Sequence, residues 1–200
     1  MKKKIFCTLL LSSLQFTSVV AQERGLFLEG KMGLNGVIEP SIHQFKAKNF
    51  ALGYKFSNEF SLKAEYSDFS FRSTQNNVES GIDQKTVALQ GIIDLTNLAD
   101  SRRARYSIFN VELHAGVGLT NITTTLQQGN DKALSLIGGI TPKLKIVDNL
   151  DLLVDATVMM NESQHFNFDG KNASTGNVNN SFTGILYNLG AGLRYTFGNY

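Results

Sequence analysis

The sequence has little cysteine, proline or tryptophan: its 200 residues include one cysteine, two prolines and no tryptophan. The single cysteine, Cys7, lies in an N-terminal segment that we expect to be removed, so neither a disulfide nor a cysteine-bound metal holds the predicted mature fold. Beyond this segment no stretch approaches about 18 consecutive apolar residues, so the sequence predicts no later transmembrane helix. The stability of the fold must then come from backbone pairing, packing and the surroundings.

The N-terminal segment has the three parts of a secretory signal peptide. Lys2, Lys3 and Lys4 precede an apolar run, which ends at the small residues Val19 and Ala21. We therefore predict a signal peptide over residues 1–21, with cleavage before Gln22, and one domain over residues 22–200. A retained membrane anchor is the alternative, but this run is interrupted by Ser, Thr and Gln and is shorter than the about 20 apolar residues that cross a bilayer.

The predicted mature chain has no excess of basic charge. Residues 1–21 carry three of the 19 basic side chains and none of the 17 acidic ones, which leaves a formal net charge of −1 after their removal. A nucleic-acid partner would need a basic stripe or patch, so the sequence predicts none.

Apolar residues recur at every second position in eight segments of the mature chain. The clearest is residues 109–120, where Phe109, Leu113 and Leu119 share one face, and Glu112 and His114 lie on the other. The sixth is the weakest, because Ile137 interrupts its polar face and Pro142 removes a backbone donor. The eight segments are residues 26–35, 50–56, 60–67, 86–95, 109–120, 134–140, 150–161 and 187–197.

An even number of strands with no helical interlude predicts an all-β fold, an eight-stranded antiparallel up-and-down barrel that leaves no unpaired edge. Long polar segments follow the first, third, fifth and seventh strands, at residues 36–48, 68–83, 121–131 and 162–182. Most of the other links are short. Long loops at one rim and short turns at the other are typical of transmembrane barrels of the bacterial outer membrane, with the long loops outside the cell.

Alternation by itself fits both a soluble barrel, which buries its apolar face, and a membrane barrel, which exposes it. Aromatic residues such as Phe50, Phe60, Tyr195 and Phe197 lie near strand ends on the apolar face, where interfacial girdles sit. The polar face carries charges of both signs at mid-strand, as a paired network in the lumen would require. These features favour the membrane barrel and a lumen network of Glu29, Lys31, Lys55, Lys63, Glu65, Glu112, His114, Asp151, Asp155 and Arg194.

The closing segment NLGAGLRYTFGNY, the sequence VVAQ at the end of the signal and the eight-strand layout resemble small outer-membrane β-barrel proteins, such as the OmpA transmembrane domain and its OmpX-like and OmpW-like relatives. The resemblance implies an outer-membrane location in a Gram-negative bacterium, with membrane lipid, lipopolysaccharide and the barrel assembly machinery as partners. It also implies an assembly signal in the last strand, formed by Leu193, Tyr195 and Phe197. If Tyr200 rather than Phe197 were the terminal aromatic residue of this signal, Arg194 would fall at one of its hydrophobic positions.

An eight-stranded barrel encloses a lumen that side chains fill, so we expect a non-enzymatic protein with a structural or porin-like role. A narrow, gated ion path is one alternative for the interior charges. An enzyme would require a nucleophile, a base and an orienting group, and His114 beside Glu112 offers only part of such a set. Among the loops, residues 162–182 suggest surface binding or adhesion as the second candidate role. We predict no metal and no cofactor, because the stretch around Asp169 and Gly170 lacks the ligand pattern of a calcium loop.

Overall fold

The computed structural model describes residues 24–75, 78–99, 107–126, 129–173 and 182–197. The predicted signal peptide lies outside these residues and stays a prediction. Nearly all of the described chain is in eight strands, with one short helix after the fourth. They are β1 (Gly25–Val37), β2 (Ile42–Lys55), β3 (Phe60–Gln75), β4 (Val78–Asp94), α2 (Leu95–Ala99), β5 (Phe109–Thr124), β6 (Asn130–Val147), β7 (Leu150–Gln164) and β8 (Phe182–Phe197). None of the helices in the described ranges is long and apolar enough to cross a membrane.

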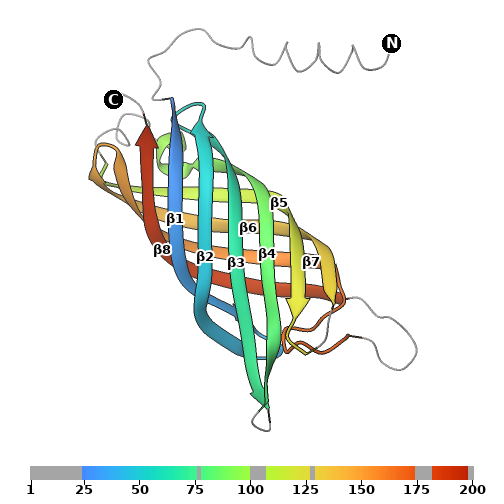
Figure 1. Ribbon diagram of the computed structural model, residues 1–200. Helices are drawn as coiled ribbons and strands as arrows, with labels where there is room; N and C mark the ends of the chain where they lie inside the picture. The colour runs from blue at the N-terminus through green and yellow to red at the C-terminus, as the bar shows by residue number, and fades with distance from the viewer. Residues whose placement is uncertain (1–23, 76–77, 100–106, 127–128, 174–181, 198–200) are drawn as a thin grey trace, which may run out of the picture.

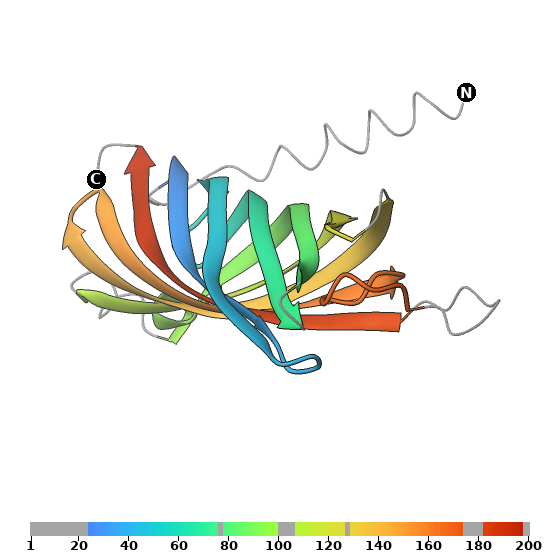
Figure 2. The ribbon, with the colours of Figure 1, turned by 60° about the horizontal axis from the view of Figure 1, so that its bottom comes forward.

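Each strand pairs antiparallel with the next, and β8 pairs with β1, so the sheet closes into a barrel (Figures 1 and 2). The predicted up-and-down eight-stranded barrel is confirmed. We call the end that holds Gly25 and Phe197 the base, and the opposite end, which holds Val37 and Phe182, the mouth. The short links after β2 and β6 lie at the base, together with α2, and the hairpin that joins β3 to β4 extends beyond the barrel at the mouth (Figure 1).

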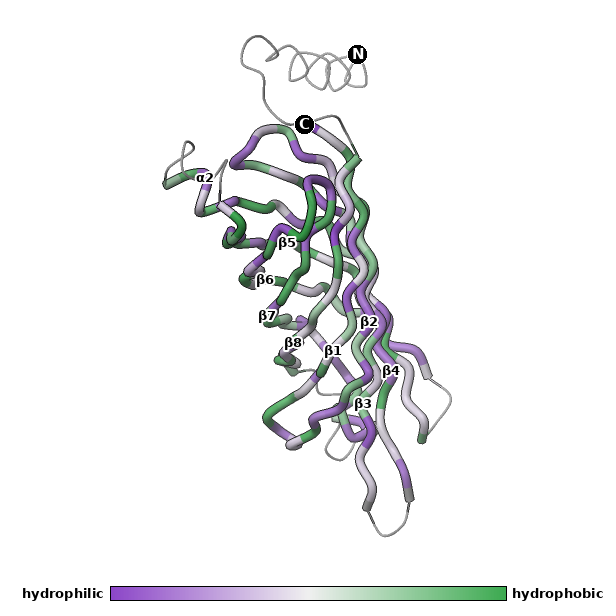
Figure 3. Tube along the Cα trace, turned by 90° about the vertical axis from the view of Figure 1, so that its left-hand side faces the viewer, coloured by the Kyte–Doolittle hydropathy of each residue, from purple (hydrophilic) through white to green (hydrophobic). Residues whose placement is uncertain are grey.

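Hydrophobic and hydrophilic residues alternate along the strands (Figure 3), and the structure decides which set faces out. Leu28 is 47 % exposed and its neighbour Phe27 is 2 % exposed, because successive side chains of a strand point to opposite faces. We call the outward apolar side chains the apolar belt. It includes Leu28, Phe50, Leu52, Leu62, Val87, Leu89, Leu113, Val117, Leu136, Val154, Val158, Leu189 and Leu193.

The apolar belt surrounds the barrel and ends in aromatic side chains near the base, among them Phe56, Phe60, Phe109, Tyr195 and Phe197. Water-soluble monomers seldom expose a continuous apolar patch of more than a few hundred Å². A closed barrel with an apolar outer band and aromatic girdles is the form that crosses the outer membrane. The prediction that the apolar face points outward and the charged face inward is confirmed.

The strands are longer at the mouth than the sequence predicts. The expected loops at residues 36–48 and 68–83 are wrong: β1 and β2 are separated only by residues 38–41, and β3 continues to Gln75 with β4 beginning at Val78. The expected loop at residues 121–131 shortens to 125–129. Beyond the apolar belt the inward side chains become apolar and the outward ones polar, as at Phe71 and Ser70 of β3, so the hydropathy pattern changes phase while the backbone pairing continues.

The sixth strand continues through Pro142, which pairs with Val111 of β5. On its other edge the register with β7 runs from Ile140↔Ala156 to Lys143↔Leu153 without pairs between them. A proline has no backbone N–H to donate, and this interruption accommodates it. The expectation of a barrel without any helical segment is also wrong, since the five-residue α2 follows β4.

Arginine substitutions at the middle and at the edge of the apolar belt test how deep each position lies in the membrane. Leu113→Arg, near the middle of the outward column of β5, should lower the free energy of unfolding in lipid vesicles by about 2–4 kcal/mol. Leu119→Arg on the same strand, beside the polar Asn121, should cost about 0–1 kcal/mol, because a charge near the interface stays hydrated. Urea titration of both variants measures the difference, and equal costs would contradict the assigned depth.

Candidate functional site

Ten ionisable side chains meet in the interior of the barrel, from the base to its middle. They come from seven of the eight strands and all are inward-facing and buried. Each carboxylate in the series lies beside a lysine or an arginine, so the charges alternate in sign from Asp94 to Asp155, and His114 follows Asp155. We call this series the ion-pair ladder: Asp94, Lys143, Glu112, Arg194, Glu29, Lys63, Glu65, Lys31, Asp155 and His114.

Arg194 of β8 is the centre of the ladder near the base. Its guanidinium donates from Nε to Oε1 of Glu29 at 2.8 Å, and from Nη1 and Nη2 to the two oxygens of Glu112, each at 2.7 Å. Lys143 adds a second cation to Glu112 at 2.6 Å and reaches Asp94 at 3.0 Å. The planar guanidinium also lies 4.5 Å from the ring centre of Phe27. A guanidinium that bridges two carboxylates in this way fixes β1, β5 and β8 relative to one another.

Two lysines continue the ladder toward the middle of the barrel. Lys63 lies 3.6 Å from Glu29 and 3.0 Å from Glu65, and Lys31 lies 3.2 Å from both Glu65 and Asp155. Both lysine side chains are at most 2 % exposed. Taking an unpaired ion out of water costs several kcal/mol, so each of these charges requires its partners.

His114 ends the ladder on Asp155. Its Nε2 lies 3.2 Å from Oδ2 of Asp155, and its Nδ1 lies 2.8 Å from Oε1 of Gln90. The hydroxyls of Thr141 and Thr157 both donate to the Asp155 carboxylate, at 2.7 and 2.6 Å. The sequence suggested Glu112 as the carboxylate beside His114. The structure puts Asp155 of β7 there instead, because Glu112 is held by Arg194 and Lys143.

Eight of the ten lumen residues predicted from the sequence belong to the ion-pair ladder. Lys55 and Asp151 are half-buried nearer the base, and Asp151 lies opposite Arg194 in the β7–β8 register. Sequence reasoning missed Asp94 and Lys143. Asp94 is on the polar face of its alternating run and could have been included, whereas Lys143 follows Pro142, where the predicted sixth strand was least defined.

Uncharged polar side chains fill the lumen on the mouth side of the ladder. The Nδ2 of Asn49 donates to the Ser67 hydroxyl at 2.8 Å. The Ser135 hydroxyl donates to Oδ1 of Asn161 at 2.7 Å, and Nδ2 of Asn161 donates to Oε1 of Gln84 at 3.0 Å. The first two of these hydrogen bonds join paired residues of adjacent strands, whereas the bond from Asn161 to Gln84 joins β7 to β4 across the lumen.

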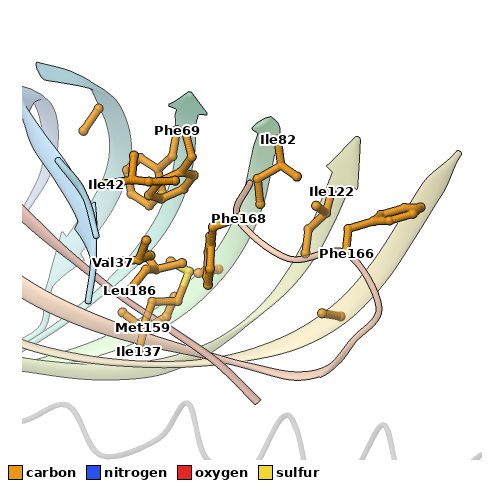
Figure 4. Close-up of a cluster of buried hydrophobic side chains, with 14 residues drawn as sticks. Val37, Ile42, Phe69, Ile82, Ile122, Ile137, Met159, Phe166, Phe168 and Leu186 are labelled. Carbon is orange, nitrogen blue, oxygen red and sulfur yellow. The ribbon is translucent and has the colours of Figure 1, made fainter. Parts of the chain in front are cut away.

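The interior at the mouth is apolar, which the sequence did not predict. Figure 4 shows the cluster, which combines inward side chains of the strands with Phe166 and Phe168 from the segment after β7. Phe168 is 1 % exposed and meets the ring of Phe71 at 5.1 Å between centres. The other members are Val37, Ile42, Ala47, Phe69, Ile82, Ala88, Ile122, Ala133, Ile137, Met159 and Leu186.

Residues 165–173 form a small hairpin that closes the mouth, and we call it the inward hairpin. Ala173 donates its backbone N–H to the His165 carbonyl at 2.8 Å, and Phe166 bridges to Asn172. Gly170 has φ of 86°, and a Cβ there would lie 2.8 Å from the Gly81 carbonyl oxygen, so only glycine fits this turn. The Thr124 hydroxyl donates to the Gly170 carbonyl at 2.7 Å.

The inward hairpin changes the interpretation of the predicted loop at residues 162–182. Part of that segment belongs to β7 and β8, and residues 165–173 fold over the lumen with Phe166 and Phe168 buried. Residues 174–181 lie outside the described part of the chain. The alternation of Phe166 and Phe168 with His165, Asn167 and Asp169 was the sequence signal that could have revealed the hairpin.

The remaining predicted residues lie on the outer surface. Leu193, Tyr195 and Phe197 of β8 point outward and are each between 44 and 47 % exposed. Tyr195 and Phe197 stack edge to face with ring centres 4.9 Å apart. Within the described residues no group of three or more His, Cys, Asp or Glu side chains is placed to hold a metal ion.

Comparisons with known proteins agree with this architecture. Neither a family model nor a curated protein sequence matches the chain. Among solved structures, Neisserial surface protein A (NspA) is similar with a TM-score of 0.58 and 14 % identity, over 87 % of this chain and 97 % of that one. A major outer membrane protein from Thermus thermophilus is similar with a TM-score of 0.57 and 12 % identity, over 87 % of this chain and 99 % of that one. The chain therefore has the fold of the small outer-membrane barrels, as its sequence resemblance implied.

Removal of Arg194, the central cation of the ion-pair ladder, should strongly destabilise the barrel. Arg194→Met should lower the free energy of unfolding by about 3–5 kcal/mol, because Glu29 and Glu112 would lose a buried partner. Urea titration in lipid vesicles measures this change. Lys132→Ala on the outer surface of β6 is the control and should stay within about 0.5 kcal/mol of the unmodified protein. A cost below about 1 kcal/mol for Arg194→Met would contradict the buried network.

Proposed function

We propose that the protein is a non-enzymatic, closed barrel of the outer membrane with a structural role, its base toward the periplasm and its mouth toward the cell exterior. The proposal rests on one observation: two chemically different sets of side chains fill two successive parts of the lumen. The ion-pair ladder occupies the half near the base, and the apolar cluster with the inward hairpin occupies the mouth. The links after β2 and β6 at the base are short, whereas at the mouth the β3–β4 hairpin projects beyond the barrel and the β7–β8 connection is long, which supports the orientation.

A hydrated ion that crosses the lumen would have to pass both the ion-pair ladder and the apolar cluster. Near the base it would have to separate pairs such as Lys63 and Glu65, 3.0 Å apart, which leaves charges without partners. At the mouth it would have to enter an apolar cluster whose members include Phe71, Ile82 and Ile122, each 0 % exposed. Both steps are unfavourable, so we favour a closed barrel over an ion path.

The surroundings of His114 argue for a structural histidine. The Thr157 hydroxyl lies 3.4 Å from Nε2 of His114, but its short hydrogen bond, at 2.6 Å, is donated to Oδ1 of Asp155. A nucleophile requires a base that accepts its proton, and this hydroxyl is directed to the carboxylate rather than to the imidazole. The site is also buried between the ladder and the polar layer.

Planar-bilayer recording tests the closed barrel. The purified protein should give no stable conductance steps, and Phe166→Ser with Phe168→Ser should remain silent because the ion-pair ladder still blocks the base. Steps in the unmodified protein that disappear in Lys63→Ala would contradict the proposal and identify an ion path through the ladder.

A second role, surface binding, is favoured by the shape of the β3–β4 hairpin. β3 and β4 stay paired to Gln75↔Val78, whereas the β2–β3 register ends at Lys48↔Asp68 and the β4–β5 register ends at Ile82↔Thr124. The arms of the hairpin therefore project beyond both neighbouring strands. A projecting strand pair offers backbone groups to which a partner can add a strand.

Shortening this hairpin separates the two roles. Replacement of residues 73–80 by a two-residue turn should leave the barrel folded and should abolish any binding of cells to matrix proteins that the intact protein confers. The matched variant shortens residues 174–181 instead and should keep that binding. Loss only in the second variant would move the role to the other connection, and no binding by the intact protein would leave the structural role alone.

A further inference from the structure

The apolar belt contains a groove on the outer surface of β1, β2 and β3, which extends to residues of β4, β7 and β8. Its volume is about 710 Å³, and outward side chains such as Leu28, Phe50, Leu52 and Tyr66 form its walls. Two small residues, Gly30 and Ala64, also line it. A Cβ added to Gly30 would meet nothing nearer than the Phe50 ring at 3.9 Å, so the space above this glycine is open.

Two lysines lie at the mouth side of this groove. Lys48 is two residues from Phe50 on β2, and Lys85 is two residues from Val87 on β4, and both Phe50 and Val87 line the groove. The two lysines lie on either side of Asp68 in the register, so their Cα atoms are about 10 Å apart. Lys46 is exposed beside them, so the region stays positive despite Asp68.

These lysines have no ionic partner among the described residues, in contrast to their neighbours. Arg72, farther toward the mouth on β3, binds Asp83 at 2.7 Å. Lys48 and Lys85 are exposed, and neither lies within ion-pair distance of a described carboxylate. Their ammonium groups are thus available to an external anion.

The apolar belt is narrow next to these lysines. The continuous run of outward apolar residues extends from Phe50 to Tyr54 on β2, but from Phe109 to Leu119 on β5. Lys48 and Lys85 therefore lie where the hydrocarbon layer ends, at the depth of lipid headgroups. Lysine stems lie along apolar surface while the ammonium reaches the polar layer, which suits this position.

We propose that the groove and the two lysines bind one phosphorylated glycolipid of the outer leaflet. Its phosphate lies between Lys48 and Lys85, and an acyl chain lies in the groove over Gly30. The groove supplies the apolar contact and the lysines supply the charge complementarity that distinguishes this lipid from a neutral one. The inference rests on the proposed orientation, because the mouth must face the leaflet that carries phosphorylated glycolipid.

Native mass spectrometry of the detergent-purified barrel tests the site, with lipid A carrying its phosphates and the same lipid without them as probes. The unmodified protein should retain the phosphorylated probe in preference to the other. Lys48→Ala combined with Lys85→Ala should weaken that binding about 30-fold, at about fivefold for each interfacial lysine. Gly30→Leu should weaken the binding of both probes, because it fills the groove.

The chain offers a matched control for each change. Lys132→Ala removes an exposed lysine at the same edge of the apolar belt on β6, away from the groove. Gly138→Leu adds a side chain at an outward glycine of β6, where a Cβ would meet nothing nearer than 4.0 Å. Both controls should bind the phosphorylated probe like the unmodified protein.

The inference is overturned if the double lysine variant binds as well as the unmodified protein, or if Lys132→Ala loses as much affinity. It is also overturned if millimolar inorganic phosphate displaces the lipid completely, since the acyl groove would then contribute nothing. Migration of unboiled samples on a gel reports separately on folding. An unmodified protein without a folded, detergent-resistant form would defeat the proposed function, whereas folded variants with equal lipid binding would defeat only the lipid site.

Discussion

Backbone pairing between β1 and β8 is the contact on which the rest of the structure depends. In lipid no water is available to satisfy an exposed strand edge, so a membrane sheet must close on itself. The register from Leu26↔Phe197 to Gly36↔Tyr187 achieves this closure. Once the sheet is closed, every strand has one face toward lipid and one toward the lumen. The apolar belt and the ion-pair ladder are the two results, since adjacent residues such as Leu28 and Glu29 must satisfy opposite surroundings.

Closure also confines the polar side chains to a narrow space, where each must find a partner. Near the base the partners are charged and alternate in sign, and farther along they are amides and hydroxyls. At the mouth apolar side chains of the strands fill the lumen together with Phe166 and Phe168 of the inward hairpin. A barrel filled in this way holds its strands together from inside. Its outer surface and its projecting β3–β4 hairpin remain available for contacts. We therefore propose lipid binding at the outer surface and partner binding at the hairpin.

The sequence predicts the barrel well where the two faces of a strand differ chemically. Within the apolar belt, hydropathy alternates with the period of the strand, so the eight strands could be read from it. The direction of their faces was inferred from the aromatic residues near strand ends and the charges at mid-strand. Beyond the belt the apolar side chains change to the inward face, as at Phe69 and Phe71 of β3, so a single alternating run no longer marks the whole strand. Pairings across the lumen were also out of reach: His114 lies two residues from Glu112 in sequence, but Asp155 of β7 is its partner. Such contacts depend on barrel register, which one sequence does not specify.

The direction of the two faces is the central claim, and the absence of tryptophan from the chain permits a direct measurement. Single-tryptophan variants Phe27→Trp and Leu28→Trp place the probe at adjacent positions that face the lumen and the lipid. In vesicles of lipids brominated along their acyl chains, the fluorescence of the Leu28→Trp variant should be strongly quenched and that of Phe27→Trp should be nearly unchanged. Equal quenching of the two, or stronger quenching of Phe27→Trp, would contradict the account.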